Sequence, residues 1–213
     1  MKKTALIVSA VTAAMLITGC GEEAAIEKVE ESTEVSAEAA SNGGTEGEDI
    51  DIEEEPSEAS EVGTRSAPLK IGERVTLDYN DLFYGDVSLE IELLEVISGD
   101  EAAELVSLGN PFNDEPGEDQ EYVLAKFNVK ANQVEEEPFD LNHAQFDAVS
   151  ESGNTYDEFI SVAGLEPDLG NELYTGAERT GYTYFLVDKD DQNPLAAFKR
   201  RTEAELWFEL KSE

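Results

Sequence analysis

The sequence predicts an all-β domain, an antiparallel β-sandwich of about seven strands with one short helix, and three observations lead to it. All 9 Phe, all 7 Tyr and the single Trp lie after residue 65, so the side chains that can build a core are confined to residues 66–213. Within this span Val, Leu and Ile alternate with polar residues in short runs, which is the period of a β-strand. Clusters of Gly, Asn, Asp and Pro separate the runs and mark turns. Such a series of short strands is typical of a sandwich.

The strand pattern recurs along the domain in short runs. In chain order they cover residues 75–79, 87–93, 123–129, 139–148, 155–160, 182–187 and 206–210. After Leu93 the apolar phase slips by one residue to Leu94 and Val96, and such a slip predicts a β-bulge. In the third run Lys126 and Lys130 are expected to face away from the core, because they alternate with apolar residues.

One helix is expected between the second and third runs. It begins near Ser98, whose spacing to Glu101 is that of a capping box. Its apolar face is expected to be formed by Ala102, Leu105 and Leu108. The helix is expected to end at Gly109, which can supply the left-handed residue of a helix C-terminus, and Pro111 prevents its continuation.

Residues 1–19 have the pattern of a lipoprotein signal peptide. Lysines follow Met1, and residues 5–17 form an apolar run that as a helix spans roughly 20 Å, short of the ~30 Å hydrocarbon core. The run closes on LITGC at residues 16–20, a lipobox that ends in the only cysteine. Cys20 is therefore expected to carry lipid and to become the mature N-terminus, with two acyl chains giving stable attachment. The alternative is an ordinary signal peptide cleaved elsewhere.

Residues 20–65 are expected to be a disordered acidic tether. After Cys20 they contain 16 Asp or Glu against one Lys and one Arg, and no aromatic residue. Such a segment cannot bury enough apolar surface to offset the entropy of ordering, and a helix over residues 24–40 would be marginal. A flexible chain of this length has an end-to-end distance of roughly 35–40 Å. We expect it to lift the domain clear of the membrane, or simply to act as a solubilising leader.

The charge balance restricts the possible partners. The chain has 50 Asp plus Glu against 14 Lys plus Arg, a formal net charge of −36, and its densest basic run is only Lys199-Arg200-Arg201. Nucleic-acid binding needs a basic patch that displaces counterions from phosphates, so a nucleic-acid partner is not expected. The same charge repels anionic lipid headgroups, so membrane attachment has to come from the lipid on Cys20. One cysteine allows no internal disulfide and no CxxC metal site.

Several segments together resemble a known family. They are AELV at 103–106, NPFN at 110–113, EYVL at 121–124, FNV at 127–129 and FLVDKDDQNPL at 185–195. This run resembles immunoglobulin-like domains of unknown function in Gram-positive surface lipoproteins, of the immunoprotective extracellular, immunoglobulin-like group. The resemblance covers about residues 69–210 and implies an immunoglobulin-like β-sandwich behind a lipobox and a linker. It implies no catalytic residues, and Tyr182 stands where relatives carry Trp.

The residues give little support for catalysis. A Ser-His-Asp mechanism needs a histidine base, and the only histidine, His143, lies in the run expected to form a strand, with no GxSxG elbow in the chain. We therefore interpret His143 as a structural or surface residue. Paired carboxylates are uninformative among 50 acidic residues. No enzymatic activity and no cofactor are expected.

A calcium-binding site is a more specific alternative than an enzymatic one. Asp188, Asp190 and Asp191 lie in a predicted loop, and residues 113–119 form a second acidic loop. Ca²⁺ takes six to eight oxygen ligands, which such loops could supply. Asn193 stands where an EF-hand loop requires glycine, and no bidentate glutamate follows at the proper spacing. A solvated hairpin loop is the preferred interpretation, and these three aspartates are the candidate ligands if a metal binds.

Together these features predict a lipid-anchored binding or interaction module on the extracytoplasmic face of the cell membrane. Its expected partners are the membrane, through Cys20, and a protein or another envelope component, and the domain is expected to be a monomer. The β-sandwich would present loops or a sheet edge to the partner. The alternatives are a calcium-dependent envelope module and an envelope hydrolase.

Overall fold

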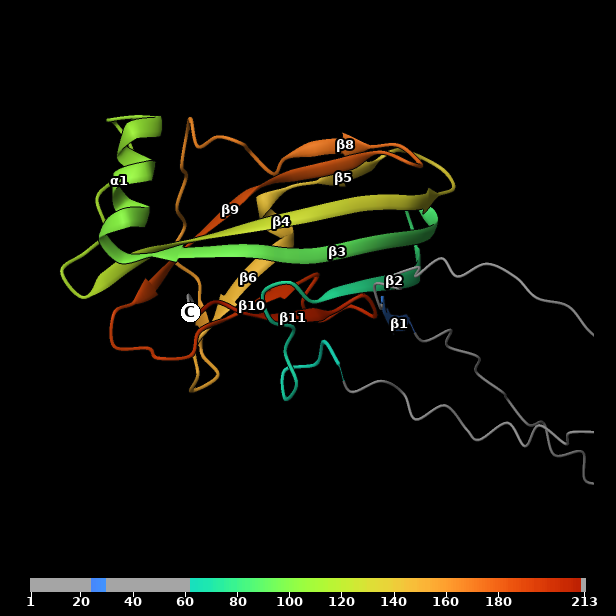
Figure 1. Ribbon diagram of the computed structural model, residues 1–213, viewed down its shortest axis with the longest axis horizontal. Coiled ribbons are helices and arrows are strands. Elements are labelled where there is room, and N and C mark those ends of the chain that lie inside the picture. The colour runs from blue at the N-terminus through green and yellow to red at the C-terminus, as the bar shows by residue number, and fades with distance from the viewer. Residues whose placement is uncertain (1–23, 30–61, 212–213) are drawn as a thin grey trace, which may run out of the picture.

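The computed structural model describes residues 24–29 and 62–211 (Figure 1). In chain order the elements are β1 (Ala25–Lys28), β2 (Arg74–Asp81), β3 (Gly85–Ser98), α1 (Gly99–Gly109), β4 (Gln120–Val134), β5 (Phe139–Leu141), the 3₁₀ turn η1 (His143–Gln145), β6 (Phe146–Val149), β7 (Thr155–Tyr156), β8 (Asn171–Leu173), β9 (Glu178–Asp188), β10 (Leu195–Phe198) and β11 (Leu206–Glu209). A five-stranded sheet has the order β1-β2-β3-β4-β9, a four-stranded sheet the order β11-β10-β6-β7, and β5 pairs with β8. All these strand pairs are antiparallel.

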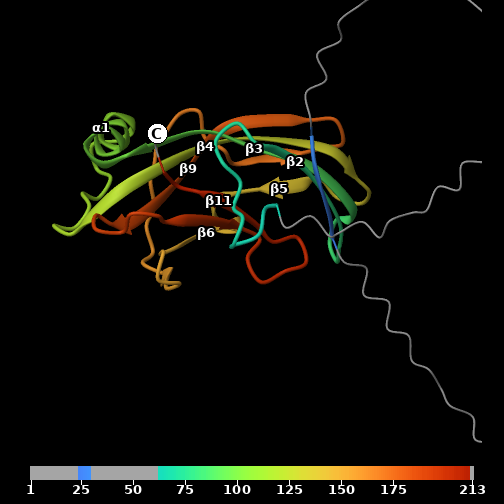
Figure 2. The ribbon, with the colours of Figure 1, turned by 60° about the horizontal axis from the view of Figure 1, so that its bottom comes forward.

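The two larger sheets enclose the main core, and Figure 2 shows β6 and β11 beneath the layer of β3 and β4. Alternate residues of the long strands point inward, so that Leu77, Ile91 and Phe127 are fully buried. The Phe127 ring centroid lies 4.8 Å from that of Phe146 and 5.0 Å from that of Phe208, both of the facing sheet. The predicted antiparallel sandwich is therefore confirmed.

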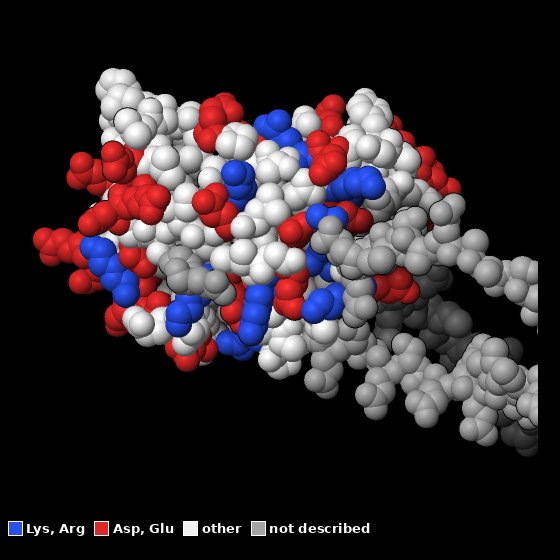
Figure 3. Space-filling model, viewed as in Figure 1, with Lys and Arg blue, Asp and Glu red and all other residues white. Residues whose placement is uncertain are grey.

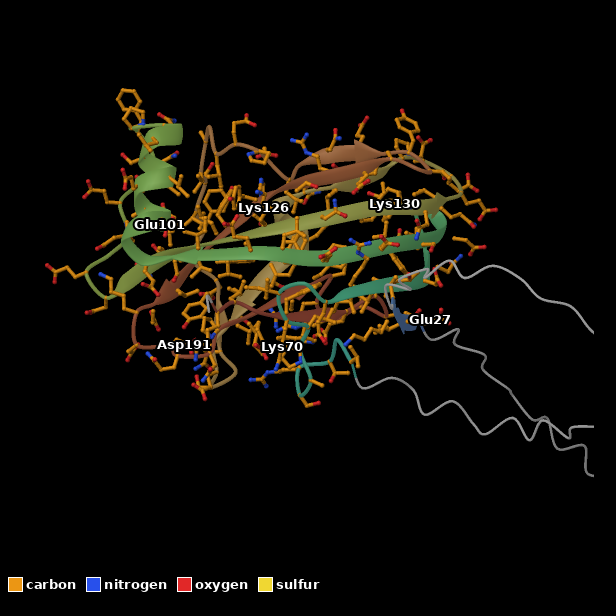
Figure 4. The ribbon with its side chains drawn as sticks, in the orientation of Figure 1. Glu27, Lys70, Glu101, Lys126, Lys130 and Asp191 are labelled. Carbon is orange, nitrogen blue, oxygen red and sulfur yellow. The ribbon has the colours of Figure 1, made fainter. Side chains whose placement is uncertain are left out.

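The predicted bulge is present in β3. The register between β3 and β4 shifts between Leu93 and Glu95, and a further shift occurs between Ser88 and Leu89. Beyond the bulge β4 is buried on both faces, because Val123 faces the main core while Leu124 packs in a second cluster with α1. Along the rest of β4, Lys126 and Lys130 lie on the outer face as predicted (Figure 4).

The helix is confirmed, but its details differ from the expectation. The Ser98 side chain makes no capping hydrogen bond, Leu108 is exposed, and Val106 is buried in its place. Gly109 does not supply a left-handed residue. A Cβ at this position would lie 2.6 Å from the carbonyl oxygen of Gly164, so the glycine is needed for the close approach of two backbones.

Two of the predicted strands were wrong in extent. Residues 139–148 form β5 and β6 in different sheets, because Asn142 starts the intervening 3₁₀ turn by accepting a hydrogen bond from the Ala144 amide at 3.1 Å. Of residues 155–160 only Thr155–Tyr156 is strand. The short strands β1, β8 and β10 were not predicted.

The expected tether also needs correction. Ala25–Lys28, within the segment expected to be disordered, forms β1 at the edge of the five-stranded sheet, and Lys28 Nζ lies 2.7 Å from a carboxylate oxygen of Glu73. The domain also begins before the expected boundary at residue 66, because the Gly63 carbonyl accepts a hydrogen bond from the Trp207 amide at 2.8 Å. The disorder was predicted from the mean composition of residues 20–65, and this average does not reveal that four of them add a strand to the edge of the sheet. The signal peptide, Cys20 and residues 30–61 lie outside the described residues.

Candidate functional site

A hollow of about 510 Å³ lies between β6, β7 and β9, beside residues 157–161. Its walls include His143, Asp147, Tyr156, Phe159, Tyr184 and Arg200, and we call it the aromatic hollow. The strand β9 is the edge of its sheet, so side chains on both of its faces can reach the opening. A larger hollow of about 880 Å³ lies near Arg65 and Leu195, but no described aromatic side chain lines it.

His143 closes one side of the aromatic hollow and is bonded through both ring nitrogens. Its Nδ1 lies 3.1 Å from Thr183 Oγ1, and its Nε2 lies 3.2 Å from Asp168 Oδ2. Its ring centroid is 4.6 Å from that of Tyr184. A neutral ring satisfies both contacts when Nε2–H donates to the carboxylate and Nδ1 accepts the hydroxyl proton of Thr183. The histidine thus links three segments that are distant in the sequence.

The loop that carries Asp168 is fixed against β9. The Gly170 amide donates to Asp168 Oδ1 at 2.6 Å, and Arg179 Nε donates to the Asp168 carbonyl oxygen at 2.7 Å. The loop touches β9 at Gly181, where a Cβ would lie 2.5 Å from the carbonyl carbon of Asp168. Asp168 is therefore a positioned acceptor for the imidazole.

The Thr183–His143–Asp168 arrangement contains the group types of a hydrolytic triad, but it lacks an accessible nucleophile. Thr183 has no exposed surface, and it lies on the core-facing side of β9. A nucleophile has to contact the substrate carbonyl or phosphoryl group. The geometry supports the structural interpretation of His143, although the residue lies in η1 and not in the strand where we expected it. The absence of enzymatic activity stays a prediction.

The remaining walls combine ring surfaces with paired charges. Phe159 is 91 % exposed at the rim. Arg200 Nε donates to Asp147 Oδ2 at 2.8 Å. Burial, and then the hydrogen bond to Asp191, raise the pKa of Tyr156 well above its usual value, so this phenol stays neutral. Apolar walls with a few fixed polar groups are the usual composition of a ligand site.

The candidate calcium residues lie next to this hollow. Asp188, Asp190 and Asp191 line an adjoining depression of about 560 Å³, and Figure 4 shows Asp191 near the molecular surface. Asp191 accepts the Tyr156 hydroxyl proton at 2.7 Å and the Asn193 amide at 3.2 Å. Among residues 24–29 and 62–211, no group of three or more His, Cys, Asp or Glu side chains is arranged to hold a metal ion. Asp191 therefore has a structural role here, and calcium binding stays a prediction.

The basic run at 199–201 is used inside the fold. Lys199 Nζ lies 2.8 Å from Asp81 Oδ2, and it lies 4.7 Å from the ring centroid of Tyr79 and 5.3 Å from that of Phe139. On the face in Figure 3, Lys and Arg side chains are scattered among Asp and Glu. The sequence held no signal for this mostly buried ion pair, because Lys199 and its partner Asp81 are 118 residues apart.

Comparison with protein-family models gives no match, and comparison with curated proteins gives none either. Three solved structures are similar in outline. The secreted protein MPT63 of Mycobacterium tuberculosis is 20 % identical with a TM-score of 0.44, over 68 % of this chain and 98 % of that one. The predicted lipoprotein ycdA of Bacillus subtilis is 11 % identical with a TM-score of 0.44, over 63 % of this chain but only 38 % of its own length. A conserved hypothetical protein of Bacillus anthracis is 13 % identical with a TM-score of 0.38, over 61 % and 91 %.

Proposed function

We propose that this chain is a lipid-anchored binding module of the extracytoplasmic cell envelope, and that its ligand site is the aromatic hollow. The observation that carries the ligand site is the set of rings around one concavity, with Tyr184 held by His143 and Phe159 left exposed. Aromatic side chains provide large contact areas with little entropy loss, which suits a site for a protein or envelope polymer.

The proposed location depends on the lipobox at Cys20. The described residues include no helix that is long and apolar enough to cross a bilayer. The net charge of −36 gives no electrostatic attraction to anionic lipids. Acylation of Cys20 is the attachment that the sequence itself offers.

Photo-cross-linking on whole cells tests the proposed site. A benzophenone side chain placed at Phe159 is expected to give a discrete product, because this position is at the rim of the hollow. The same group at Tyr174, which is also exposed but lies in the turn between β8 and β9, is the matched control. Excess purified domain should suppress the product, and Tyr184→Ala domain should suppress it less. Identical products from both positions, or none from Phe159, would contradict the proposed site.

The calcium-dependent alternative is distinguished by titration. Because Asp191 is engaged by Tyr156 and the turn backbone, Ca²⁺ is expected to leave the melting temperature of the domain unchanged. Heat of binding that disappears in Asp190→Asn would instead support the calcium-dependent module.

A further inference from the structure

The turn between β2 and β3 presents two large apolar side chains to solvent. Leu82 is 91 % exposed and Phe83 is 74 % exposed, whereas the next residue, Tyr84, is turned inward, with its ring centroid 5.1 Å from that of Phe139. Local contacts define the shape of the turn. The Phe83 amide donates to Asp81 Oδ1 at 2.9 Å, and Gly85 supplies the left-handed residue with a φ of 69°.

The expected lipid attachment site is close to this turn. β1 is antiparallel to β2 with Ala25 opposite Asp78 and Lys28 opposite Val75, so the N-terminal end of β1 points toward the turn. Four residues separate Cys20 from Ala25, so the five Cα–Cα steps between them span at most about 18 Å. Asp78 precedes Leu82 by four residues, which is about 13 Å along a strand. Figure 4 shows Glu27 of β1 at the end of the molecule opposite Glu101 of α1.

We infer that the Leu82–Phe83 turn inserts into the lipid interface beside acylated Cys20. The inference rests on the proposed lipid anchor. In place of the long tether expected from the sequence, a short attachment between Cys20 and β1 would hold the domain against the bilayer. A lipid anchor keeps the turn at the membrane at high effective concentration, so two apolar side chains can contribute although they could not hold a free domain there.

The charges around the turn indicate that the attraction is apolar. Glu203 lines the depression beside Leu82 and Phe83, and Glu135 and Glu136 lie against Gly85. These carboxylates repel anionic headgroups. We therefore expect insertion into neutral lipid, with no gain when anionic lipid is added.

Fluorescence quenching of the full-length acylated protein tests this inference. Phe83→Trp and Phe112→Trp are reconstituted in phosphatidylcholine vesicles with or without brominated acyl chains. Phe112 is the control because it is also exposed but follows α1, at the other end of the 14-residue strand β3. Bromination should remove about half of the added emission of Phe83→Trp, because interfacial apolar side chains lie about 5–10 Å into the headgroup boundary. It should leave Phe112→Trp unchanged, and buried Trp207 gives the same background in both variants.

The possible outcomes are distinct. Protein that floats with the vesicles but shows equal quenching for both variants contradicts the insertion and leaves the lipid anchor standing. Protein that does not float contradicts the proposed anchor and the insertion with it. If the emission of Phe83→Trp shifts to the blue without vesicles, and the shift grows with protein concentration, the turn contacts a second copy of the chain instead of lipid. Stronger quenching on phosphatidylglycerol vesicles would show electrostatic docking and contradict the apolar mechanism.

Discussion

Replacing Lys199 with methionine is expected to lower the free energy of unfolding by about 3 kcal/mol, because it leaves a mostly buried carboxylate without its cation. The side chains of Lys199 and Asp81 are only 12 % and 17 % exposed, and their charged atoms are 2.8 Å apart. The methionine keeps the apolar contact with the rings of Tyr79 and Phe139, so the loss of stability measures the effect of removing the positive charge. Urea denaturation of the purified domain measures the difference.

Two further variants make this result specific. Adding Asp81→Asn to Lys199→Met removes the unpaired charge and should restore part of the lost stability. Lys28→Met breaks an ion pair with Glu73 whose side chains are 47 % and 30 % exposed, so it should cost less than about 1 kcal/mol. Equal losses from Lys199→Met and Lys28→Met would contradict a special role for Lys199.

The same pair gives a pH dependence. Burial raises the pKa of the Asp81 carboxyl, but the hydrogen bond from Lys199 and those from the Phe83 and Tyr84 amides outweigh it, so the pKa lies below its usual value. A lowered pKa in the folded state stabilises the protein above the unfolded pKa, which is about 4. This stability is lost as the pH falls through the lower folded value. Below about pH 4 the wild type should therefore lose stability that Asp81→Asn does not lose.

Replacing Gly181 with alanine is the second change expected to have a large effect, again about 3 kcal/mol. The added Cβ would lie 2.5 Å from the carbonyl carbon of Asp168 and 2.5 Å from the Leu169 nitrogen. Both are backbone atoms, so the loop has to move away from β9, and this movement breaks the contact between the Asp168 carboxylate and His143. Urea denaturation measures the loss, and the proton spectrum of the single histidine reports the altered environment of its ring.

Gly117→Ala is the control for Gly181→Ala. At Gly117 the nearest atom to an added Cβ is the end of the Gln120 side chain at 2.7 Å, and a flexible side chain can move aside. We expect this variant to unfold within about 0.5 kcal/mol of the wild type. If Gly181→Ala were equally stable, with an unchanged histidine spectrum, the close packing of the Asp168 loop would be contradicted.

The long strands could be predicted because their inward and outward residues alternate over many positions. Leu89, Ile91 and Leu93 are all fully buried on one face, and the slip after Leu93 marked the bulge. The short strands β1, β8 and β10 have three or four residues each, too few for a period to appear. Their strand conformation depends on the partner strand that they complete.

The candidate site could not be predicted, because tertiary contacts create it. His143 was identified from the sequence as the only histidine, but its partners Asp168 and Thr183 are 25 and 40 residues away. The alternation of apolar residues over 139–148 suggested one continuous strand. Instead, the Asn142 cap turns the chain at this point and directs His143 toward β9. No local pattern distinguished Tyr184 or Phe159 from core aromatic residues.

Cell fractionation of Cys20→Ser tests the lipid-anchored module most directly. The variant cannot be acylated at position 20, and neither the acidic surface nor the Leu82–Phe83 turn is sufficient to retain a free domain at the membrane. Wild-type protein is expected in the membrane fraction, and the variant is expected in the medium as a folded domain with the unfolding midpoint of the wild-type sandwich. Retention of folded Cys20→Ser in the membrane fraction would contradict the account.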